Sequence, residues 1–492
     1  MALSADWNGP RRSATRSVER RSGPDRGLRN VSAVVEIRGV FPAGIALLAD
    51  ADTARPIAWR DGEAVTARDF LAEAVALSAQ LPSARYAINL CEDRYRFSVA
   101  FCAAAVAGQT NLLPGSRMPQ TIAETRAAYP DSYVLAERVP QDPNARHFVL
   151  PGVLETDKAT PMPSLPPEHI VAIAFTSGST GAPKANPKTW GALCASSAFN
   201  AGAICAGAAP NIVATVPPQH MYGLELSVLL PLRSHAAIHS GHPFFPADIV
   251  HALVQIPAPR LLVTTPHHLR ALLRSDAVLP ALDAIVSATA PLPAELARTA
   301  EARYRTRVVE VFGSTETCVI AHRRTARGEP WSPYPGIALH PQPDGTLVDA
   351  PYFPAPTLLH DIVELLPDKR FCLCGRNGDL LEIAGKRASL GDLNRRLLAI
   401  PGVEDGAIFQ LDADDRGVRR LAALAVAPNL DATQILDALR AAIDPVFLPR
   451  PLRLVAALPR NAAGKLPRAA LLKGACEQAT VQASRALHQN VE

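Results

Sequence analysis

The sequence predicts an α/β protein with a large N-terminal domain of doubly wound parallel sheets and a small α+β domain after it. Its 492 residues are enough for about three units of ~150 residues each. Between residues 170 and 312, short β-branched or apolar runs alternate with helical patterns, which is typical of parallel sheets covered by helices on both faces. After Gly375 the pattern changes to short strands and two amphipathic helices, and this change predicts the second domain.

The strands expected in the large domain are apolar runs of four to six residues. They are Ile170–Phe175, Ile212–Val216, Ala236–His239, Leu261–Thr264, Ala284–Ser287 and Val308–Phe312. A helix is expected over His267–Arg274, because Thr265 can cap it and Pro266 suits its first position. Ligands of open parallel sheets bind at the carboxyl ends of the strands, so we expect the chemistry in the loops that follow these runs.

The small domain is predicted to begin near Arg376. Phe371–Arg376 and Asp379–Ala384 flank Asn377-Gly378, a dipeptide typical of tight hairpins, and predict a hairpin. The elements expected after it are a helix with Leu390, Leu393, Leu397 and Leu398 on one stripe, strands Gly406–Leu411 and Leu421–Val426, and a helix that buries Ile435, Leu436, Leu439 and Ile443. We therefore divide the chain into a basic extension (1–30), a large domain (31–375), a small domain (376–475) and a tail (476–492).

Composition excludes several classes of protein. A chain that is 48% hydrophobic and 20% charged is not intrinsically disordered over most of its length. Its 8 cysteines are too sparse for a disulfide scaffold, and this favours a cytoplasmic location. The longest apolar stretch, Phe97–Gly108, is shorter than the ~20 residues of a membrane span. The arginine-rich first 30 residues are interpreted as a disordered extension, with a targeting segment or a nucleic-acid arm as alternatives.

A loop rich in glycine and hydroxyl groups follows the first predicted strand of this series. Its glycines let the backbone approach an anion closely, its hydroxyl and N–H groups can bind phosphate oxygens, and its lysine supplies positive charge. The spacing differs from a Walker A loop, and a loop of this composition alone is also typical of a flexible turn. The residues concerned are Thr176, Ser177, Gly178, Ser179, Thr180, Gly181 and Lys184.

Two further motifs support nucleotide binding. Val311-Phe-Gly-Ser-Thr-Glu316 ends the last strand of the series, where Phe312 is placed to stack on a base, Thr315 to reach a phosphate and Glu316 to hold Mg²⁺. Leu458-Pro-Arg-Asn-Ala-Ala-Gly-Lys-Leu-Pro-Arg468 places Lys465 on a turn framed by Gly464 and Pro467. Taken singly, Glu316 is interpreted as a surface acid and Lys465 as a solvated lysine.

Together, in this order and at this spacing, the motifs resemble the adenylate-forming superfamily, which includes acyl- and aryl-CoA synthetases, peptide-synthetase adenylation domains and firefly-type luciferases. The resemblance covers roughly residues 45–473 and implies a large N-terminal domain and a small mobile C-terminal domain. Thr176–Lys184 resembles the family's phosphate loop. The segment Phe312, Gly313, Thr315 and Glu316 resembles its YGxTE motif, with Phe in place of Tyr. Asp361 and Arg376 resemble the ribose-binding pair, and Lys465 the lysine that bridges substrate carboxylate and α-phosphate.

The resemblance implies a ligase that uses ATP and Mg²⁺ to convert a small carboxylic acid into an acyl-adenylate. A thiol then displaces AMP and forms a thioester, and the thiol donor is coenzyme A or the phosphopantetheine of an acyl carrier protein. Gly385, Lys386 and Arg387 resemble the segment that contacts the thiol donor. Gly378 stands where the family usually has an Asp or Lys hinge residue, about which the small domain turns between the two steps.

The acid is expected to lack an ammonium group. His220, Tyr222, Gly223, Ala288 and Thr289 resemble the acyl-pocket positions of the family, and no acidic residue lies between Val216 and Gly223 to pair with an amino acid. A fatty, aryl or arylalkenoic acid is therefore favoured. The segment Lys188-Thr-Trp-Gly is similar to ligases of bacterial aryl-polyene and xanthomonadin-type pathways. For His220, a hydrogen-bonded core histidine is the alternative reading.

Three other functions remain open at this point. A stand-alone amino-acid adenylation enzyme is disfavoured by the missing pocket acid. A non-catalytic nucleotide- or acyl-binding homologue is disfavoured because Lys184, Glu316, Asp361, Arg376 and Lys465 are all present. Nucleic-acid binding through the arginine-rich start would show affinity that falls steeply with salt, and we expect no nucleic-acid partner.

Overall fold

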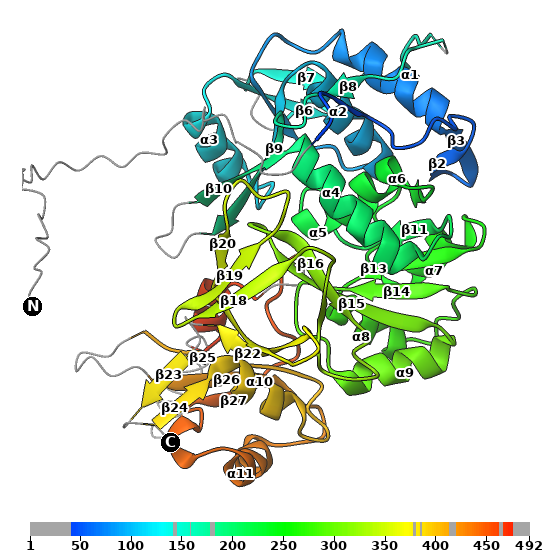
Figure 1. The fold of residues 1–492 in the computed structure, drawn as a ribbon. Helices are drawn as coiled ribbons and strands as arrows, with labels where there is room; N and C mark the ends of the chain where they lie inside the picture. Colours follow the sequence, from blue (N-terminus) through cyan, green and yellow to red (C-terminus); the bar gives the residue numbers. More distant parts are fainter. Residues whose placement is uncertain are drawn as a thin grey trace, which may run out of the picture. The chain divides into compact units, whose positions relative to one another are not determined.

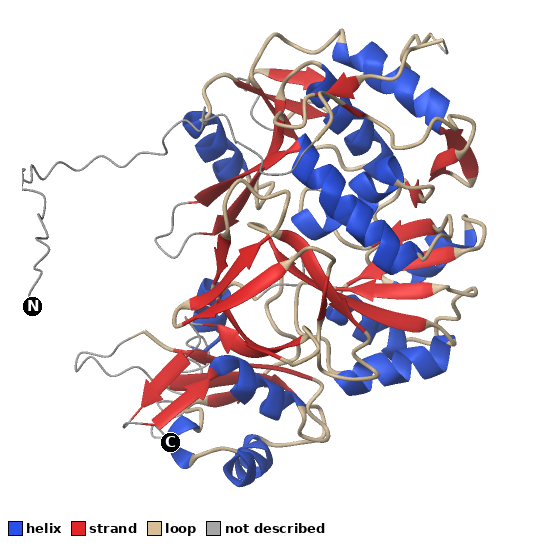
Figure 2. Cartoon of the chain, in the orientation of Figure 1, coloured by secondary structure: helices blue, strands red, loops and turns tan. Residues whose placement is uncertain are grey.

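The computed structural model describes residues 41–140, 145–157, 159–177, 183–376, 380–383, 386–412, 420–461 and 466–475. The predicted basic extension and C-terminal tail lie outside these residues. All described residues belong to one unit of the chain, Val34–Glu492. The observed architecture is α/β, with parallel sheets and helices in the large N-terminal part and small α+β elements in the C-terminal part, as the sequence predicts (Figures 1 and 2).

The first large sheet has six strands and is parallel except for its edge strand β10. In spatial order the strands are β10 (Pro183–Thr189), β9 (Ile170–Ser177), β5 (Thr110–Leu113), β4 (Tyr86–Asn89), β6 (Ser132–Ala136) and β7 (His147–Val149). The helices of this part of the chain are α1 (Ala67–Ser78), α2 (Arg94–Val106) and α3 (Pro119–Ala128). A separate two-stranded pair joins β1 (Ile45–Ala46) to β8 (Ser164–Leu165).

The second large sheet has nine strands, with a parallel centre and antiparallel edges. In order they are β17 (Ser332–Pro333), β16 (Cys318–Arg323), β15 (Arg307–Ser314), β14 (Ala284–Ser287), β13 (Arg260–Thr264), β11 (Asn211–Ala214), β12 (Ala237–His239), β2 (Pro56–Arg60) and β3 (Glu63–Thr66). Its helices are α4 (Trp190–Asn200), α5 (Met221–Leu224), α6 (Leu230–Arg233), α7 (Pro246–Val254), α8 (Pro266–Arg274) and α9 (Ala294–Tyr304), with π-helical turns at Ala201–Cys205 and Glu225–Leu229.

Helices α2 and α4 are shared between the two sheets. Helix α2 contacts β4 and β5 of the first sheet and β12 of the second, and α4 contacts β10 and β16. Eleven of the 13 residues of α2 are buried, because small and apolar side chains surround it on almost every side. One continuous apolar core therefore joins both sheets through this layer of helices.

The predicted strands of the large domain are all confirmed, but they do not form one sheet. The run that begins at Ile170 becomes β9 of the first sheet, whereas the other five become strands of the second. Helix α8 also begins as predicted, because the Thr265 side chain accepts a hydrogen bond from the backbone N–H of His268. Local pattern gives the strand, whereas packing decides which sheet a strand joins.

The C-terminal part contains small antiparallel and mixed sheets. Their strands are β18 (Ala338–Gln342), β19 (Gly345–Asp349), β20 (Thr357–Leu359), β21 (Asp361–Leu365), β22 (Phe371–Arg376), β23 (Leu380–Ile383), β24 (Lys386–Ser389), β25 (Asp405–Gln410), β26 (Leu421–Val426) and β27 (Leu452–Leu454). Helices α10 (Leu390–Leu398) and α11 (Ala432–Ala442) bury Leu393, Leu397, Ile435 and Leu439 against β25 and β26. A 3₁₀ turn covers Pro445–Phe447.

The hairpin predicted around Asn377-Gly378 is wrong. Strand β22 pairs with the preceding strand β21, and β23 pairs with the following strand β24. The two predicted strands are separate elements, as expected, but each pairs with the strand on its other side in the sequence. The residues Asn377 and Gly378 themselves lie outside the described part of the chain.

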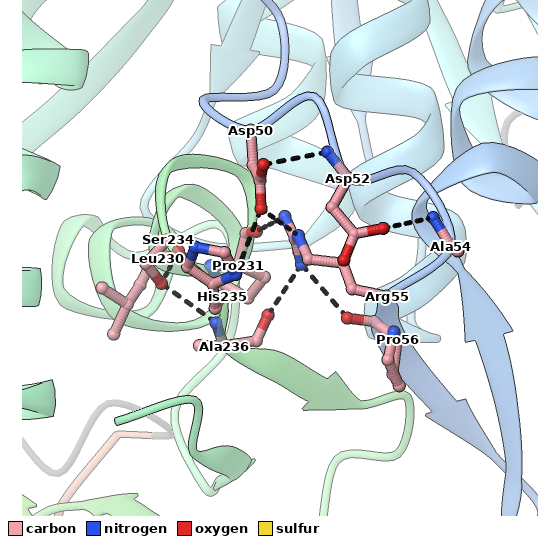
Figure 3. A network of polar contacts seen from close by, with 10 residues as sticks. All are labelled: Asp50, Asp52, Ala54, Arg55, Pro56, Leu230, Pro231, Ser234, His235 and Ala236. Atoms are coloured by element: carbon pink, nitrogen blue, oxygen red, sulfur yellow. Dashed lines mark hydrogen bonds and ion pairs between the residues drawn. The ribbon is translucent and has the colours of Figure 1, made fainter. Parts of the chain in front are cut away.

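A buried arginine fastens strand β2 beside β12 (Figure 3). Arg55 is 7% exposed. Its guanidinium donates to three backbone carbonyls from two distant parts of the chain: Pro56 O (3.1 Å), Pro231 O (2.9 Å) and Ala236 O (3.4 Å). Burial lowers the pKa of Arg55, and the carboxylate of Asp50, 3.8 Å from Nε, acts in the opposite direction. The arginine thereby ties the start of β2 to α6 and to the residue that precedes β12.

No helix in the described part of the chain is both long enough and apolar enough to cross a membrane.

Candidate active site

The predicted phosphate loop connects β9 to β10, which lie antiparallel. Thr176 is opposite Lys184 in this pair, and the Asn186 side-chain nitrogen lies 3.3 Å from Thr176 Oγ1 and 3.0 Å from the Lys184 carbonyl. The exposed Lys184 and the half-buried Thr176 therefore stand opposite each other at the loop end of the hairpin. The residues Gly178, Ser179, Thr180 and Gly181, and the side chain of Ser177, lie outside the described part of the chain.

The second nucleotide motif forms a tight turn between β15 and β16. Ser314 Oγ accepts hydrogen bonds from the N–H groups of Glu316 (3.1 Å) and Thr317 (3.2 Å), and Thr317 Oγ1 accepts from Ser314 N–H (3.1 Å). Gly313 is required here, because a Cβ at this position would lie 2.0 Å from the Cys318 carbonyl oxygen. The turn presents Thr315 and Glu316, both half-buried, beyond the end of the strand.

Phe312 lies in an aromatic cluster. Its ring centroid is 5.3 Å from that of Trp331 and 5.9 Å from that of Phe371. The guanidinium of Arg323 lies 4.2 Å from the centre of the Trp331 ring. These contacts fix the Phe312 ring at the end of β15, where a purine base could stack on it only from its remaining exposed side.

Glu316 has the chemistry of a magnesium ligand. Its side chain is half-buried, and no other residue within the described ranges donates a hydrogen bond or an ion pair to its carboxylate. A carboxylate that the described residues leave unengaged matches the all-oxygen coordination that Mg²⁺ prefers. A Mg²⁺ ion held there would neutralise phosphate charge.

Lys188 joins the two nucleotide motifs, a role that the sequence analysis did not assign to it. Its Nζ donates a hydrogen bond of 2.6 Å to the backbone carbonyl of Glu316. Lys188 is 6% exposed, although lysine is rarely buried without a partner. The sequence does carry one sign of this role. Lys188 lies on the same strand face as Lys184, and apolar residues follow Lys188 in the sequence.

The predicted ribose-binding residues lie opposite each other. Asp361 begins β21 and pairs in register with Arg376, the last residue of β22. The Asp361 carbonyl accepts a hydrogen bond of 2.7 Å from Thr346 Oγ1 on β19. The two consecutive strands thus bring together two residues that are separated in the sequence, while the side chain of Arg376 lies outside the described residues.

Lys465 and Gly378 lie outside the described part of the chain. The segment that carries Lys465 is anchored upstream by Arg460, whose Nη2 lies 2.9 and 3.0 Å from the two carboxylate oxygens of Asp405 at the start of β25. Downstream, Arg468 pairs with Asp412 at 2.8 Å. Both ends of this segment are therefore tied to the C-terminal β25 region.

The predicted acyl-pocket residues gather at the carboxyl ends of β11, β13 and β14. His220 is the residue before α5, and Tyr222 lies on that helix with its hydroxyl 3.1 Å from the Thr264 carbonyl and 2.9 Å from the Val286 carbonyl. The hydroxyl of Tyr222 is therefore committed to the strand ends. Gly223 must be glycine, because a Cβ there would lie 2.0 Å from the Pro217 carbonyl oxygen.

Ala288 and Thr289 follow β14 directly. Ala288 is 9% exposed, and Thr289 adopts a φ of 79°, a left-handed conformation that is costly for a β-branched residue. Thr289 Oγ1 is buried and has no hydrogen-bond partner among the described residues. A strained residue with an unpaired hydroxyl at the carboxyl end of a strand is typical of a binding site.

Arg94 binds the carboxyl end of β11, which leads into the segment of His220. It is 0% exposed, and its Nη2 donates to the carbonyls of Ala214 (2.9 Å) and Val216 (2.8 Å), where β11 ends. Nη1 donates to Ser227 Oγ at 2.6 Å. Burial lowers the pKa of Arg94 to about 9. The arginine therefore holds the start of the segment that carries His220.

Of the predicted thiol-donor residues, only the Lys386 side chain is described. It is exposed and forms an ion pair with Asp444, whose pKa is lowered by the hydrogen bond from Lys386. Gly385 and the side chain of Arg387 lie outside the described residues.

Comparison with known proteins identifies the family. Residues 71–351 match the AMP-binding enzyme family. The chain belongs to this family. AMP-binding enzymes use ATP and Mg²⁺ with coenzyme A as co-substrate, in agreement with the cofactors predicted from the sequence.

Curated relatives of this AMP-binding enzyme include two 4-coumarate–CoA ligases. That of Halorhodospira halophila is 30% identical over 322 residues, which are 61% of this chain and 76% of the relative. That of Rhodobacter capsulatus is 32% identical over 301 residues, which are 61% of this chain and 75% of the relative.

Solved structures share the fold. ATP-bound MatB from Rhodopseudomonas palustris has a TM-score of 0.75 at 17% identity and covers 87% of this chain and 97% of its own. The o-succinylbenzoate CoA synthetase MenE from Bacillus subtilis, in complex with its acyl-adenylate, has a TM-score of 0.73 at 16% identity and covers 86% and 96%.

Substituting Gly313→Ala should lower ATP-dependent turnover about a hundredfold. The added methyl group would force the Glu316 turn away from Cys318, and a displacement of about 1 Å in a catalytic group costs roughly a hundredfold in rate. Pyrophosphate release under saturating ATP measures the effect. The matched control is Gly152→Ala, where a Cβ meets no atom within 4 Å and wild-type activity is expected. Full activity of the Gly313 variant would contradict the placement of this turn in the ATP site.

Proposed function

We propose that this protein is an AMP-forming acid–thiol ligase that activates an aryl or arylalkenoic acid and transfers it to coenzyme A. The observation that carries this proposal is the make-up of the segment before and within α5. It places His220, Tyr222 and Gly223 at the strand ends without an acidic side chain. A pocket of this kind suits an uncharged, flat acyl group. The similarity to 4-coumarate–CoA ligases supports the same class of acid.

The acidic residue nearest to this segment, Glu225, is unavailable to a substrate. It is 1% exposed, and its Oε2 accepts hydrogen bonds from Ser196 Oγ (2.7 Å) and the backbone N–H of Val319 (3.0 Å). A substrate ammonium would therefore lack a carboxylate partner, and placing it in the pocket would carry the cost of an unpaired buried charge. This argues against an amino-acid adenylation enzyme.

The proposed chemistry begins with an attack of the substrate carboxylate on the α-phosphorus of ATP. The bond to pyrophosphate breaks, and a mixed anhydride of the acid and AMP forms. Lys184 and the phosphate loop bind the phosphate oxygens, and Lys465 bridges the carboxylate and the α-phosphate. Mg²⁺ on Glu316 supplies charge neutralisation when it is bound. The protein thus contributes positioning and electrostatic stabilisation.

In the second step the thiol sulfur attacks the acyl carbon, and AMP leaves with the electrons of the anhydride bond. We propose that the small domain (376–475) turns about the junction at Gly378, so that Lys465 leaves and the segment of Lys386 meets the thiol donor. Lys386 and Arg387 are suited to the phosphate of a phosphopantetheine group. A carrier protein in place of coenzyme A, and a fatty acid in place of an aromatic one, are the alternatives within this proposal. The cytoplasm is the proposed location.

The direct test is pyrophosphate release with Mg·ATP across benzoates, hydroxycinnamates, fatty acids and amino acids, each with and without coenzyme A. Hydroxycinnamates or benzoates should give the highest rates, and coenzyme A should raise turnover by allowing AMP to leave. Release with amino acids alone would overturn the substrate class. Release that coenzyme A does not affect would favour a carrier protein as the acceptor.

Lys465→Ala should separate the two half-reactions. Removing the bridging ammonium should lower adenylate formation by about a hundredfold to a thousandfold, as for other single groups that stabilise transition-state charge. Thioester formation from synthetic acyl-AMP and coenzyme A should stay within about threefold of wild type. Equal losses in both steps would contradict the proposed turning of the C-terminal part.

Thr289→Val should change the preference among acids and leave the maximal rate largely intact. A neutral hydrogen bond contributes about 0.5–1.5 kcal/mol, so the variant should lose about threefold to tenfold in kcat/KM for hydroxylated acids relative to their unsubstituted analogues. Thr306→Val is the matched control, because Thr306 Oγ1 is also buried without a partner but precedes the amino end of β15. An unchanged ratio of the two kcat/KM values would remove Thr289 from the acyl pocket.

A further inference from the structure

A line of polar residues runs along one face of the edge strand β10. Side chains two residues apart in a strand share a face, so Lys184, Asn186 and Lys188 point the same way. Their exposure falls along the strand: Lys184 is exposed, whereas Asn186 is 7% and Lys188 is 6% exposed. Lys188 lies about 13 Å along the strand from Lys184 at ~3.3 Å per residue, which is too far for it to serve the phosphate loop directly.

The Lys188 ammonium ends at the turn that carries Glu316. Its 2.6 Å hydrogen bond to the Glu316 carbonyl crosses from β10, in the first large sheet, to the β15–β16 turn, in the second. Within that turn, Glu316 N–H is already bound by Ser314 Oγ. Both polar groups of the Glu316 backbone are therefore engaged, and its carboxylate alone is left to the site.

The charge of Lys188 acts on the buried carboxyl group of Glu225. Burial raises the pKa of Glu225, and hydrogen bonds from Ser196 and Val319 together with the charge of Lys188 act against this rise. The hydrogen-bonding network continues through Asn200, which lies 3.4 Å from Glu225 Oε2 and accepts a 2.9 Å bond from the Tyr334 hydroxyl. Glu225 also binds the backbone of Val319 on β16, so the network holds the strand that leaves the turn.

We infer that Lys188 is a positioning residue for Mg·ATP: it fixes the Glu316 backbone against β10 so that the Glu316 carboxylate is held toward the phosphates bound by the loop at Lys184. Strand β10, which follows the phosphate loop, and the Glu316 turn belong to different sheets, and Lys188 is a polar side chain that ties one to the other. Catalytic groups must be held to within about 0.5 Å, and a buried lysine that donates to the backbone of the turn provides that rigidity. The inference deepens the proposed function through its ATP site and is independent of which acid is activated.

Direct binding of ATP in the absence of any acid tests this role. Isothermal titration calorimetry is carried out with ATP plus Mg²⁺ and with ATP plus EDTA. The ratio of the dissociation constant in EDTA to that in Mg²⁺, called the Mg²⁺-dependent ratio, reports the contribution of the metal. For Lys188→Met, this ratio should fall about tenfold, as for the loss of a hydrogen bond to a charged group, while the affinity in EDTA should change less than twofold. Lys188→Arg should recover part of the ratio, since it keeps a donor and a charge.

Loss of the Lys188 charge also lowers stability, because the buried Glu225 loses a nearby positive charge that favours its ionised form. The double variant Lys188→Met/Glu225→Gln removes both charges while its amide can still accept from Ser196 and Val319. Its urea midpoint should return toward that of the wild type, but its Mg²⁺-dependent ratio should stay low. Tyr334→Phe is the matched control, because it removes a hydrogen bond of the same network without touching Glu316, and its ratio should equal that of the wild type.

A double-mutant cycle with Glu316→Gln identifies the group through which Lys188 acts. In the Glu316→Gln background, Lys188→Met should cause no further loss of the Mg²⁺-dependent ratio. Two results would overturn the inference: a double variant of wild-type stability with a full ratio, or equal losses in Mg²⁺ and in EDTA. Either can be obtained whether or not the proposed acid substrates are turned over, so the two proposals fail separately.

Discussion

The active site depends on two separate sheets being held side by side by a shared layer of helices. Helices α2 and α4 contact both sheets, and a continuous apolar core passes through them. The phosphate loop leaves the edge of one sheet, and the Glu316 turn leaves the other. An apolar layer supplies most of the cohesion but little direction, because hydrophobic attraction is not directional. The Lys188 hydrogen bond supplies the direction at the point where the two sheets meet in the site.

Buried polar side chains recur wherever strand ends must be fixed. Arg94 binds the carbonyls that end β11, Arg55 binds the loops beside β12, and Tyr222 binds the carbonyls at the ends of β13 and β14. Arg94 and Tyr222 bind carbonyls at the carboxyl edge of the parallel sheet, whereas Arg55 binds carbonyls at the amino ends of β2 and β12 and on α6. Because such carbonyls are costly to bury alone, Arg94 and Tyr222 make the carboxyl edge rigid as well as stable. The predicted acyl-pocket positions lie along that edge.

The chemistry of the site follows from the repulsion between anions. A carboxylate and a triphosphate must approach each other, so cationic groups and Mg²⁺ have to be present around them, and the acyl group needs an uncharged pocket. The six-stranded sheet carries Lys184 and the nine-stranded sheet carries the turn of Glu316, and the predicted ribose-binding residues Asp361 and Arg376 stand opposite each other on β21 and β22. The distribution of these groups over several elements explains why the motifs are separated by long stretches of sequence.

The sequence by itself determined the strands of the large domain, the start of α8, the small C-terminal elements and the family. These features rest on local periodicity, on caps such as Thr265, and on motifs whose residues are close in the chain. Only the tertiary structure decided that β9 and β11 belong to different sheets, that β22 pairs with β21 and not with β23, and that Lys188 contacts Glu316. Each of these depends on contacts between residues far apart in sequence, and a strand's own pattern specifies its faces without specifying its neighbour.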